Sequence, residues 1–212
     1  MSQPDLFVEQ KPGKRKKARK QRRVLDSYYT PPWMTQAFIR EAPDLLGGVL
    51  LDPCAGDGRM SRQLMRAGHF SRVVLNDAAP DRAPLRYDAT RPELYEHLAR
   101  EGGAPDAVIT NPPFCVAGAL AWQALAHARR CVALLLRISF LEPVEARQWL
   151  LRLPPTRQIA LSRDSFDGSG QTDSATCSWF IWTRGPDGMW QRGSIVVVSE
   201  REMGQPGLLV EP

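Results

Sequence analysis

The chain has 212 residues, 43% of them hydrophobic, so it can bury one sizeable core and is expected to form one domain with extensions. No apolar run approaches the roughly 18 residues that a membrane span needs, and no signal-peptide core is recognised near the N-terminus. The four cysteines and three histidines are scattered, which argues against a disulfide framework and a metal site and favours a soluble protein of the reducing cytoplasm.

The net charge of +5 comes from a basic N-terminal segment. Residues 11–23 contain nine Lys or Arg and no acid, and removing these nine charges leaves −4 for the rest of the chain. Such a segment repels itself and has almost nothing to bury, so residues 1–24 are expected to form a disordered arm. A solubilising terminus or a localisation signal would have a similar composition, but the charge density favours an arm that binds nucleic-acid phosphates. The candidate nucleic-acid-binding residues are Lys14, Arg15, Lys16, Lys17, Arg19, Lys20, Arg22 and Arg23.

From about residue 33 onward, short apolar runs alternate with amphipathic segments, several of which end at glycines. The expected helices cover 33–46, 59–68, 93–103, 118–130 and 143–153, and the expected strands cover 49–52, 72–77, 85–89, 106–111, 131–140, 157–162 and 178–184. The connection that follows residue 77 is too short and too rich in proline to be a helix.

This alternation predicts an α/β fold, a doubly wound and mostly parallel Rossmann-like sheet with helices on both faces. The last two strands have no helix between them, so they are expected to pair as an antiparallel hairpin at one edge of the sheet. Residues 25–185 would form this domain and residues 186–212 a C-terminal extension. In such sheets, ligands bind at the carboxyl ends of the strands, where the strand order reverses.

Polar side chains stand at the ends of four successive expected strands, namely Asp52, Asp77, Asp88 and Asn111. The first begins the loop "DPCAGDG", in which Gly56 and Gly58 allow a tight turn and a close approach of backbone N–H groups to a ligand. An acid here suits a cationic ligand. Asp77, about twenty residues beyond the glycines, has the spacing at which an acid binds ribose hydroxyls. Each residue alone would be an ordinary cap, but together they predict a ligand site.

The segment "NPPF", residues 111–114, ends a buried strand on two prolines, which have no N–H to donate to a sheet ladder. Asn-Pro is an ordinary turn opener, so the corner could be a simple strand end. Alternatively, the corner holds an amide, a carbonyl and an aromatic ring fixed for chemistry.

The loop "DPCAGDG" followed by "NPPF", with "YYTPPW" ahead of both, resembles the S-adenosylmethionine-dependent DNA N6-adenine methyltransferases. The later segments "LLRISFLE" and "SRDSFDGSGQTDSATCSWFIW" are similar to the corresponding stretches of phage-type members of that family. The resemblance covers residues 26–184, and the motif order is that of the gamma group. It implies the class I methyltransferase fold, S-adenosyl-L-methionine as the cofactor, DNA as the substrate, and a bacterial or phage-infected cell as the setting.

The resemblance also implies roles for individual residues. Thr30 and Pro31, with Tyr28 or Tyr29, would contact the methionyl end of the cofactor. The amino-acid moiety would be held by Asp52 and by the loop residues Pro53, Cys54, Ala55, Gly56 and Gly58. Asp77 would bind the ribose hydroxyls, and Asp88 the adenine amino group.

The target base would be held by Asn111, Pro112, Pro113 and Phe114. The Asn111 side-chain oxygen and the Pro112 carbonyl would accept the two hydrogens of the adenine amino group and so favour a pyramidal nitrogen with its lone pair aimed at the methyl carbon. Pro113 would stiffen the corner, and Phe114 would stack on the flipped base. No metal is required.

Other substrates remain compatible with this corner, because guanine in ribosomal RNA and a glutamine amide in a protein also present a planar nitrogen. A non-catalytic nucleic-acid-binding relic of the fold is a further alternative. No target-recognition domain is visible, so specificity would come from the loop 164–176, the segment after Phe114 and the basic arm. A monomer is favoured.

Overall fold

The computed structural model of the chain describes residues 30–141, 153–162, 176–191 and 195–198. The helices are α1 (Pro32–Glu41), α2 (Arg59–Ala67), α3 (Glu93–Arg100) and α4 (Ala117–His127), with 3-10 turns η1 (Pro43–Leu45) and η2 (Ile138–Leu141). The strands are β1 (Gly47–Asp52), β2 (His69–Leu75), β3 (Ala107–Thr110), β4 (Cys131–Arg137), β5 (Arg157–Leu161), β6 (Cys177–Thr183) and β7 (Ile195–Val198). None of the helices described is long and apolar enough to cross a membrane.

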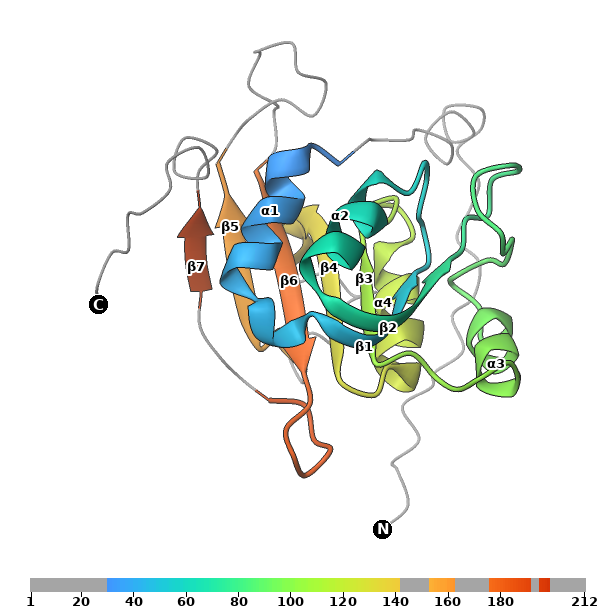
Figure 1. Cartoon of the computed structure of the whole chain (residues 1–212). Helices are drawn as coiled ribbons and strands as arrows, with labels where there is room; N and C mark the ends of the chain where they lie inside the picture. Colours follow the sequence, from blue (N-terminus) through green and yellow to red (C-terminus); the bar gives the residue numbers. More distant parts are fainter. Residues whose placement is uncertain (1–29, 142–152, 163–175, 192–194, 199–212) are drawn as a thin grey trace, which may run out of the picture.

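The strands form one seven-stranded sheet in the order β2-β1-β3-β4-β6-β5-β7 (Figure 1). Strand β1 pairs in parallel with β2 and β3, β3 pairs in parallel with β4, and β5 pairs in parallel with β7. Strand β6 is antiparallel to both of its neighbours, β4 and β5. The mostly parallel α/β sheet predicted from the sequence is therefore confirmed.

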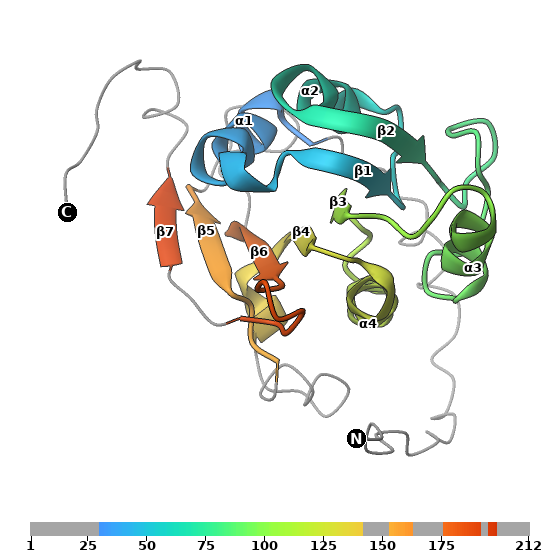
Figure 2. The same cartoon turned by 60° about the horizontal axis from the view of Figure 1, so that its bottom comes forward.

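Helices cover both faces of the sheet because successive residues of each strand point to opposite sides. Figure 2 shows α1 and α2 on one side and α3 and α4 on the other. In β1, Leu50 belongs to the core cluster that includes Phe38 of α1 and Leu64 of α2, whereas Leu51 belongs to the cluster that includes Leu98 of α3 and Leu120 of α4. The central strand β4 is buried from Cys131 to Leu136, as a strand covered on both faces must be.

The predicted hairpin is correct in its pairing and wrong in its position. Strands β5 and β6 pair as antiparallel neighbours, but β6 lies inside the sheet, hydrogen-bonded to β4 along its whole length. The sheet ends instead at β7, a strand within residues 186–212 that the sequence pattern did not predict. Strand β7 lies beside β5 because β5 is left with an unpaired edge once β6 has inserted next to β4.

Several element boundaries also differ from expectation. The strand expected over 85–89 is absent; only an isolated parallel bridge joins Asn76 to Leu85. The helix expected over 33–46 ends at Glu41, and Pro43, which cannot continue an α-helix, begins a 3-10 turn. Strand β4 ends at Arg137 and a 3-10 turn follows it. The helix expected over 143–153 lies almost wholly outside the described residues.

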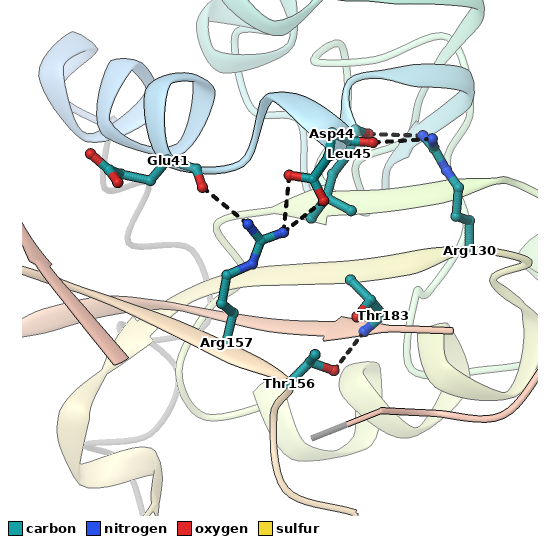
Figure 3. A network of polar contacts seen from close by, with 7 residues as sticks. All are labelled: Glu41, Asp44, Leu45, Arg130, Thr156, Arg157 and Thr183. Atoms are coloured by element: carbon teal, nitrogen blue, oxygen red, sulfur yellow. Dashed lines mark hydrogen bonds and ion pairs between the residues drawn. The ribbon is translucent and has the colours of Figure 1, made fainter. Parts of the chain in front are cut away.

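Two arginines, Arg130 and Arg157, bind the segment that connects α1 to β1 (Figure 3). Both lie at the amino ends of β4 and β5, away from the carboxyl edge where a ligand is expected. The Arg157 guanidinium donates to both carboxylate oxygens of Asp44 and to the Glu41 carbonyl. The Arg130 guanidinium donates to the Leu45 and Gly47 carbonyls at 2.9 and 2.7 Å. These contacts hold the segment between α1 and β1 against the beginnings of β4 and β5. Neither arginine therefore takes part in the carboxyl edge of the sheet.

Candidate active site

The carboxyl ends of the four parallel strands β2, β1, β3 and β4 meet at one edge of the sheet. Asp52 is the last residue of β1, Asp77 follows β2 by two positions, Asn111 follows β3 directly, and Arg137 ends β4. Because β1 lies between β2 and β3, the polar residues predicted at three of the strand ends are neighbours across adjacent strands. The strand order reverses beside β1, which is where doubly wound sheets bind ligands.

Asp52 is completely buried, and its carboxylate is surrounded by donors of the chain itself. One oxygen accepts from the Thr110 hydroxyl at 2.7 Å and from the Cys54 N–H at 3.3 Å, and the other accepts from the Ser61 hydroxyl. These contacts join the end of β1 to the end of β3 and to the first turn of α2. The carboxylate therefore couples the glycine loop to the residue that precedes Asn111.

Burial raises the pKa of Asp52 from 3.8 to about 6, against the opposing effect of its hydrogen bonds. Because the folded pKa lies above the unfolded one, folding favours the protonated carboxyl. This contribution to stability is fully present below pH 4 and is lost as the pH rises through about 6.

We expect Asp52→Asn to remove this pH dependence, because the amide keeps acceptor and donor atoms for Thr110 and Ser61 but carries no charge. Between pH 4 and 7, the free energy of unfolding of the wild type should fall relative to the variant by up to about 3 kcal/mol, as a shift of about two pKa units implies. Urea unfolding of both proteins over this pH range measures the difference. Parallel pH profiles would contradict a raised pKa at Asp52.

The glycine loop is held by Asp77. One oxygen of its carboxylate accepts from the Gly56 N–H at 2.9 Å, and the other accepts from the Ala79 N–H at 2.8 Å. Gly56 and Gly58 both have positive φ angles, 55° and 74°, which explains why glycine stands at these positions. A Cβ atom at Gly56 would meet nothing within 4 Å, so the backbone there is open to a ligand.

Asn76 was not recognised from the sequence, yet it organises this part of the site. Its buried side-chain amide donates to the carbonyls of Pro53 and Tyr87 at 2.9 and 3.0 Å, and its oxygen accepts from the Tyr87 N–H at 2.8 Å. The Asn76 side chain thus bonds the backbone groups of Tyr87 that a neighbouring strand would otherwise pair with. It also holds the glycine loop and the segment before Asp88 close together. An amide directly before the strand-end acid was the signal that could have indicated this role.

Asp88 is exposed and shapes the turn before α3. Its carboxylate accepts from the N–H and hydroxyl of Thr90 at 2.9 and 2.7 Å, and its carbonyl accepts from the Arg91 N–H. The sequence placed Asp88 at the end of a strand. It follows instead an irregular segment that Asn76 holds in place.

The NPPF corner begins where β3 ends. The Asn111 side-chain nitrogen donates to the Thr30 hydroxyl at 3.0 Å, a contact between residues 81 positions apart. Pro112 is buried, and the Pro113 carbonyl accepts from the Val116 N–H as the chain turns into α4. The half-buried Phe114 ring packs against both core clusters, and the Arg137 guanidinium carbon lies 4.9 Å from the ring centroid.

The structure thus brings together most of the predicted site residues. Thr30 lies against Asn111, Asp52 against Thr110, and Asp77 against Gly56. Pro31 precedes α1 and accepts from the Met34 N–H. Cys54 is half-buried, and burial raises the pKa of its thiol. Tyr28, Tyr29 and the eight arm cations lie outside the described residues.

Fold and site together define an α/β protein in which a glycine loop and a proline corner meet at the carboxyl edge of the sheet, the edge where such sheets bind ligands. No protein-family model matches the chain. Among solved structures, the chain is similar to a protein of Listeria monocytogenes assigned to the class I S-adenosylmethionine-dependent methyltransferases, with a TM-score of 0.61 and 12% identity over 84% of this chain and 67% of that chain.

A second similar structure is a modification subunit assigned to a type I restriction enzyme of Vibrio vulnificus, with a TM-score of 0.51 and 15% identity over 82% of this chain and 47% of that chain. The chain therefore spans two thirds of the first protein's length and less than half of the second's. The fold is the Rossmann-like fold of class I methyltransferases.

Proposed function

We propose that the chain transfers a methyl group from S-adenosyl-L-methionine to the exocyclic N6 of adenine in DNA, with the target base turned out of the duplex. The observation that carries this proposal is the arrangement of Asn111. Its amide donates to Thr30 and stands beside the acid-lined glycine loop, to which Asp52 and Thr110 link it. An amide and a proline carbonyl at this edge are acceptors suited to an amino group that must lose its planarity.

The residues present fit the cofactor. The open backbone at Gly56 admits the ligand, and Asp77, half-buried beneath it, is assigned to the ribose hydroxyls. The exposed Asp88 is assigned to the adenine amino group, and Thr30, Pro31 and Tyr28 or Tyr29 to the methionyl end. Acids around the loop suit a ligand that carries a sulfonium and an ammonium. When bound, the cofactor supplies an electrophilic methyl group.

Asp52 acts on the cofactor indirectly in this proposal. Its carboxylate is fully buried and accepts one hydrogen bond from the loop, from the Cys54 N–H, and two from the Thr110 and Ser61 hydroxyls. Asp52 thereby anchors at Cys54 the loop that contains Pro53, Ala55, Gly56 and Gly58. The backbone of this loop then binds the amino-acid moiety. This assignment keeps Asp52 in the cofactor site as a positioning residue.

At the corner, the Asn111 oxygen and the Pro112 carbonyl accept the two hydrogens of the target amino group. These bonds strengthen as positive charge develops on the nitrogen, and they leave its lone pair directed at the methyl carbon. Pro112 and Pro113 limit the motion of the corner, and Phe114 stacks on the base. The remaining contribution to catalysis is to position the target nitrogen against the methyl group.

Thr30 sets which end of the Asn111 amide faces the target, because an amide nitrogen that donates to Thr30 keeps the oxygen on the opposite side. Thr30→Val should lower the single-turnover rate of methyl transfer about tenfold, the worth of one orienting hydrogen bond. Thr30→Ser, which keeps the hydroxyl, should restore most of the rate. A variant that loses only cofactor affinity would show that Thr30 serves the cofactor and leaves Asn111 unaffected.

The proposed domain division assigns residues 25–185 to catalysis and residues 1–24 to an arm that binds phosphates. The described part of residues 186–212 adds β7 to the sheet. RNA is the second candidate substrate, since an arm of Lys and Arg binds either polyanion.

The test is to incubate the full chain with methyl-labelled cofactor and, separately, unmethylated DNA, RNA and protein extract. The proposal expects label in DNA. Label in RNA or protein alone would replace DNA by that substrate, and no label in any would favour a non-catalytic protein.

A further inference from the structure

Arg137 covers the aromatic ring of the corner. The guanidinium carbon lies 4.9 Å from the Phe114 ring centroid, and Arg137 is exposed whereas Phe114 is half-buried. The cation therefore occupies a ring face that adjoins solvent. That face is where a base entering the corner from outside would stack.

This arginine differs from the structural arginines of the molecule. Arg130, Arg157 and Arg184 each donate to backbone carbonyls that they tie together. Among the residues that the structure describes, the Arg137 side chain has no hydrogen-bond acceptor and no acidic partner. A cation–π contact at an exposed site is weak, so the guanidinium can leave the ring for a better partner.

The position of Arg137 follows from the register of the sheet. The last paired residues of β3 and β4 are Thr110 and Leu134, and β4 continues for three more residues, held by β6 as far as the pair Arg137–Cys177. Arg137 is therefore fixed on a strand, level with the NPPF corner. The acids Asp77 and Asp88 lie on the other side of the switch point, so the edge has an acidic side for the cofactor and a cationic side for a polyanion.

We propose that Arg137 is a substrate-binding residue with two positions, an inference that rests on the proposed function. Without nucleic acid, the guanidinium covers Phe114. When the target base stacks on Phe114, the guanidinium leaves the ring and binds a phosphate that flanks the extruded nucleotide. Guanidinium–phosphate bonds are charge-assisted and often bidentate, so they are stronger than the contact that is given up.

The test uses two probes that differ only in phosphate, 2′-deoxyadenosine and 2′-deoxyadenosine 3′,5′-bisphosphate. Their binding to the full chain is followed by saturation-transfer NMR in the presence of saturating S-adenosylhomocysteine, which keeps the nucleoside out of the cofactor site. The variants are Arg137→Gln, which removes the charge, and Arg137→Lys, which keeps it without the bidentate geometry. Arg129→Gln is the matched control, since Arg129 is exposed near the amino end of the same strand.

Arg137→Gln should weaken binding of the bisphosphate about tenfold, the loss expected for one charge-assisted contact, and should leave binding of the nucleoside unchanged or tighter because the ring is uncovered. The affinity of Arg137→Lys for the bisphosphate should lie between those of the wild type and Arg137→Gln, and the affinity of Arg129→Gln should match that of the wild type. On DNA, Arg137→Gln should lower the slope of log affinity against log salt by about one unit.

Equal changes for both probes, or none, would overturn the proposal. Failure of the proposed function would appear differently, as a wild-type protein that leaves no label in DNA whatever the Arg137 variants bind. A wild type that binds neither probe would likewise overturn the proposal for Arg137, whereas the labelling of DNA decides the proposed function separately.

Discussion

Replacing Asn111 by alanine is expected to lower the single-turnover rate of methyl transfer by about 100-fold or more, while the affinity for the cofactor stays near that of the wild type. The substitution removes one of the two acceptors for the target amino group, and an acceptor that acts mainly in the transition state is worth about 3 kcal/mol. Most of the proposed cofactor contacts lie elsewhere, on the glycine loop and on Asp77 and Asp88. Thr30, which is assigned to the methionyl end, loses its contact with Asn111 but keeps its own hydroxyl.

Rapid-quench measurement with saturating cofactor and DNA gives the rate, and calorimetry gives the cofactor affinity. Gln36→Ala is the matched control, because Gln36 is an exposed amide on α1. Asn111→Ala also removes the hydrogen bond between Asn111 and the Thr30 hydroxyl, so the thermal stability of this variant should be measured together with its rate. Full turnover by Asn111→Ala would remove the corner from the mechanism.

Replacing Asp77 by alanine is expected to weaken cofactor binding about 30-fold or more, equivalent to about 2 kcal/mol. Two causes act together, because Asp77 is the proposed acceptor for the ribose hydroxyls and also anchors the N–H groups of Gly56 and Ala79. The second cause was not visible in the sequence. It means that loss of affinity alone does not prove contact with the ribose.

A second ligand separates the two causes. S-adenosylhomocysteine and its analogue lacking the ribose hydroxyls are titrated into the wild type and Asp77→Ala, which completes a double-mutant cycle. If Asp77 binds the ribose, the wild type prefers the natural ligand and the variant loses most of that preference. If Asp77 only anchors the loop, both proteins keep the same preference.

The alternation of apolar runs and glycine stops was sufficient to predict the helices α2, α3 and α4 and six of the strands, because those patterns are local. The strand expected over 85–89 was wrong for a reason that is not local. Its backbone groups at Tyr87 are bonded to the side chain of Asn76, which leaves no ladder to form. Strand β7 was missed because its pairing depends on the free edge of β5, which exists only after β6 has inserted beside β4.

In the candidate site, too, local features could be predicted from the sequence and long-range contacts could not. The identities of Asp52, Asp77, Asn111 and the two glycines could be read as a set from their places at strand ends. The contacts among them could not, since Thr30 meets Asn111 and Thr110 meets Asp52 across long stretches of chain. Burial also changed the interpretation of Asp52, from an acid that holds the amino-acid moiety of the cofactor directly to a buried carboxylate beneath the loop. The sequence did not single out Arg137 within the segment "LLRISFLE", because its place over Phe114 depends on the register of β3 and β4.

The central claim is that the corner acts on the N6 atom of adenine in DNA. Its most direct test is to incubate the full chain with methyl-deuterated S-adenosyl-L-methionine and DNA from a strain without adenine methylation, to digest the DNA, and to identify labelled nucleosides by mass spectrometry. We expect labelled N6-methyl-2′-deoxyadenosine from the wild type and about 100-fold less of it from Asn111→Ala under single-turnover conditions. Label on cytosine or guanine, or equal yields from the two proteins, would contradict it.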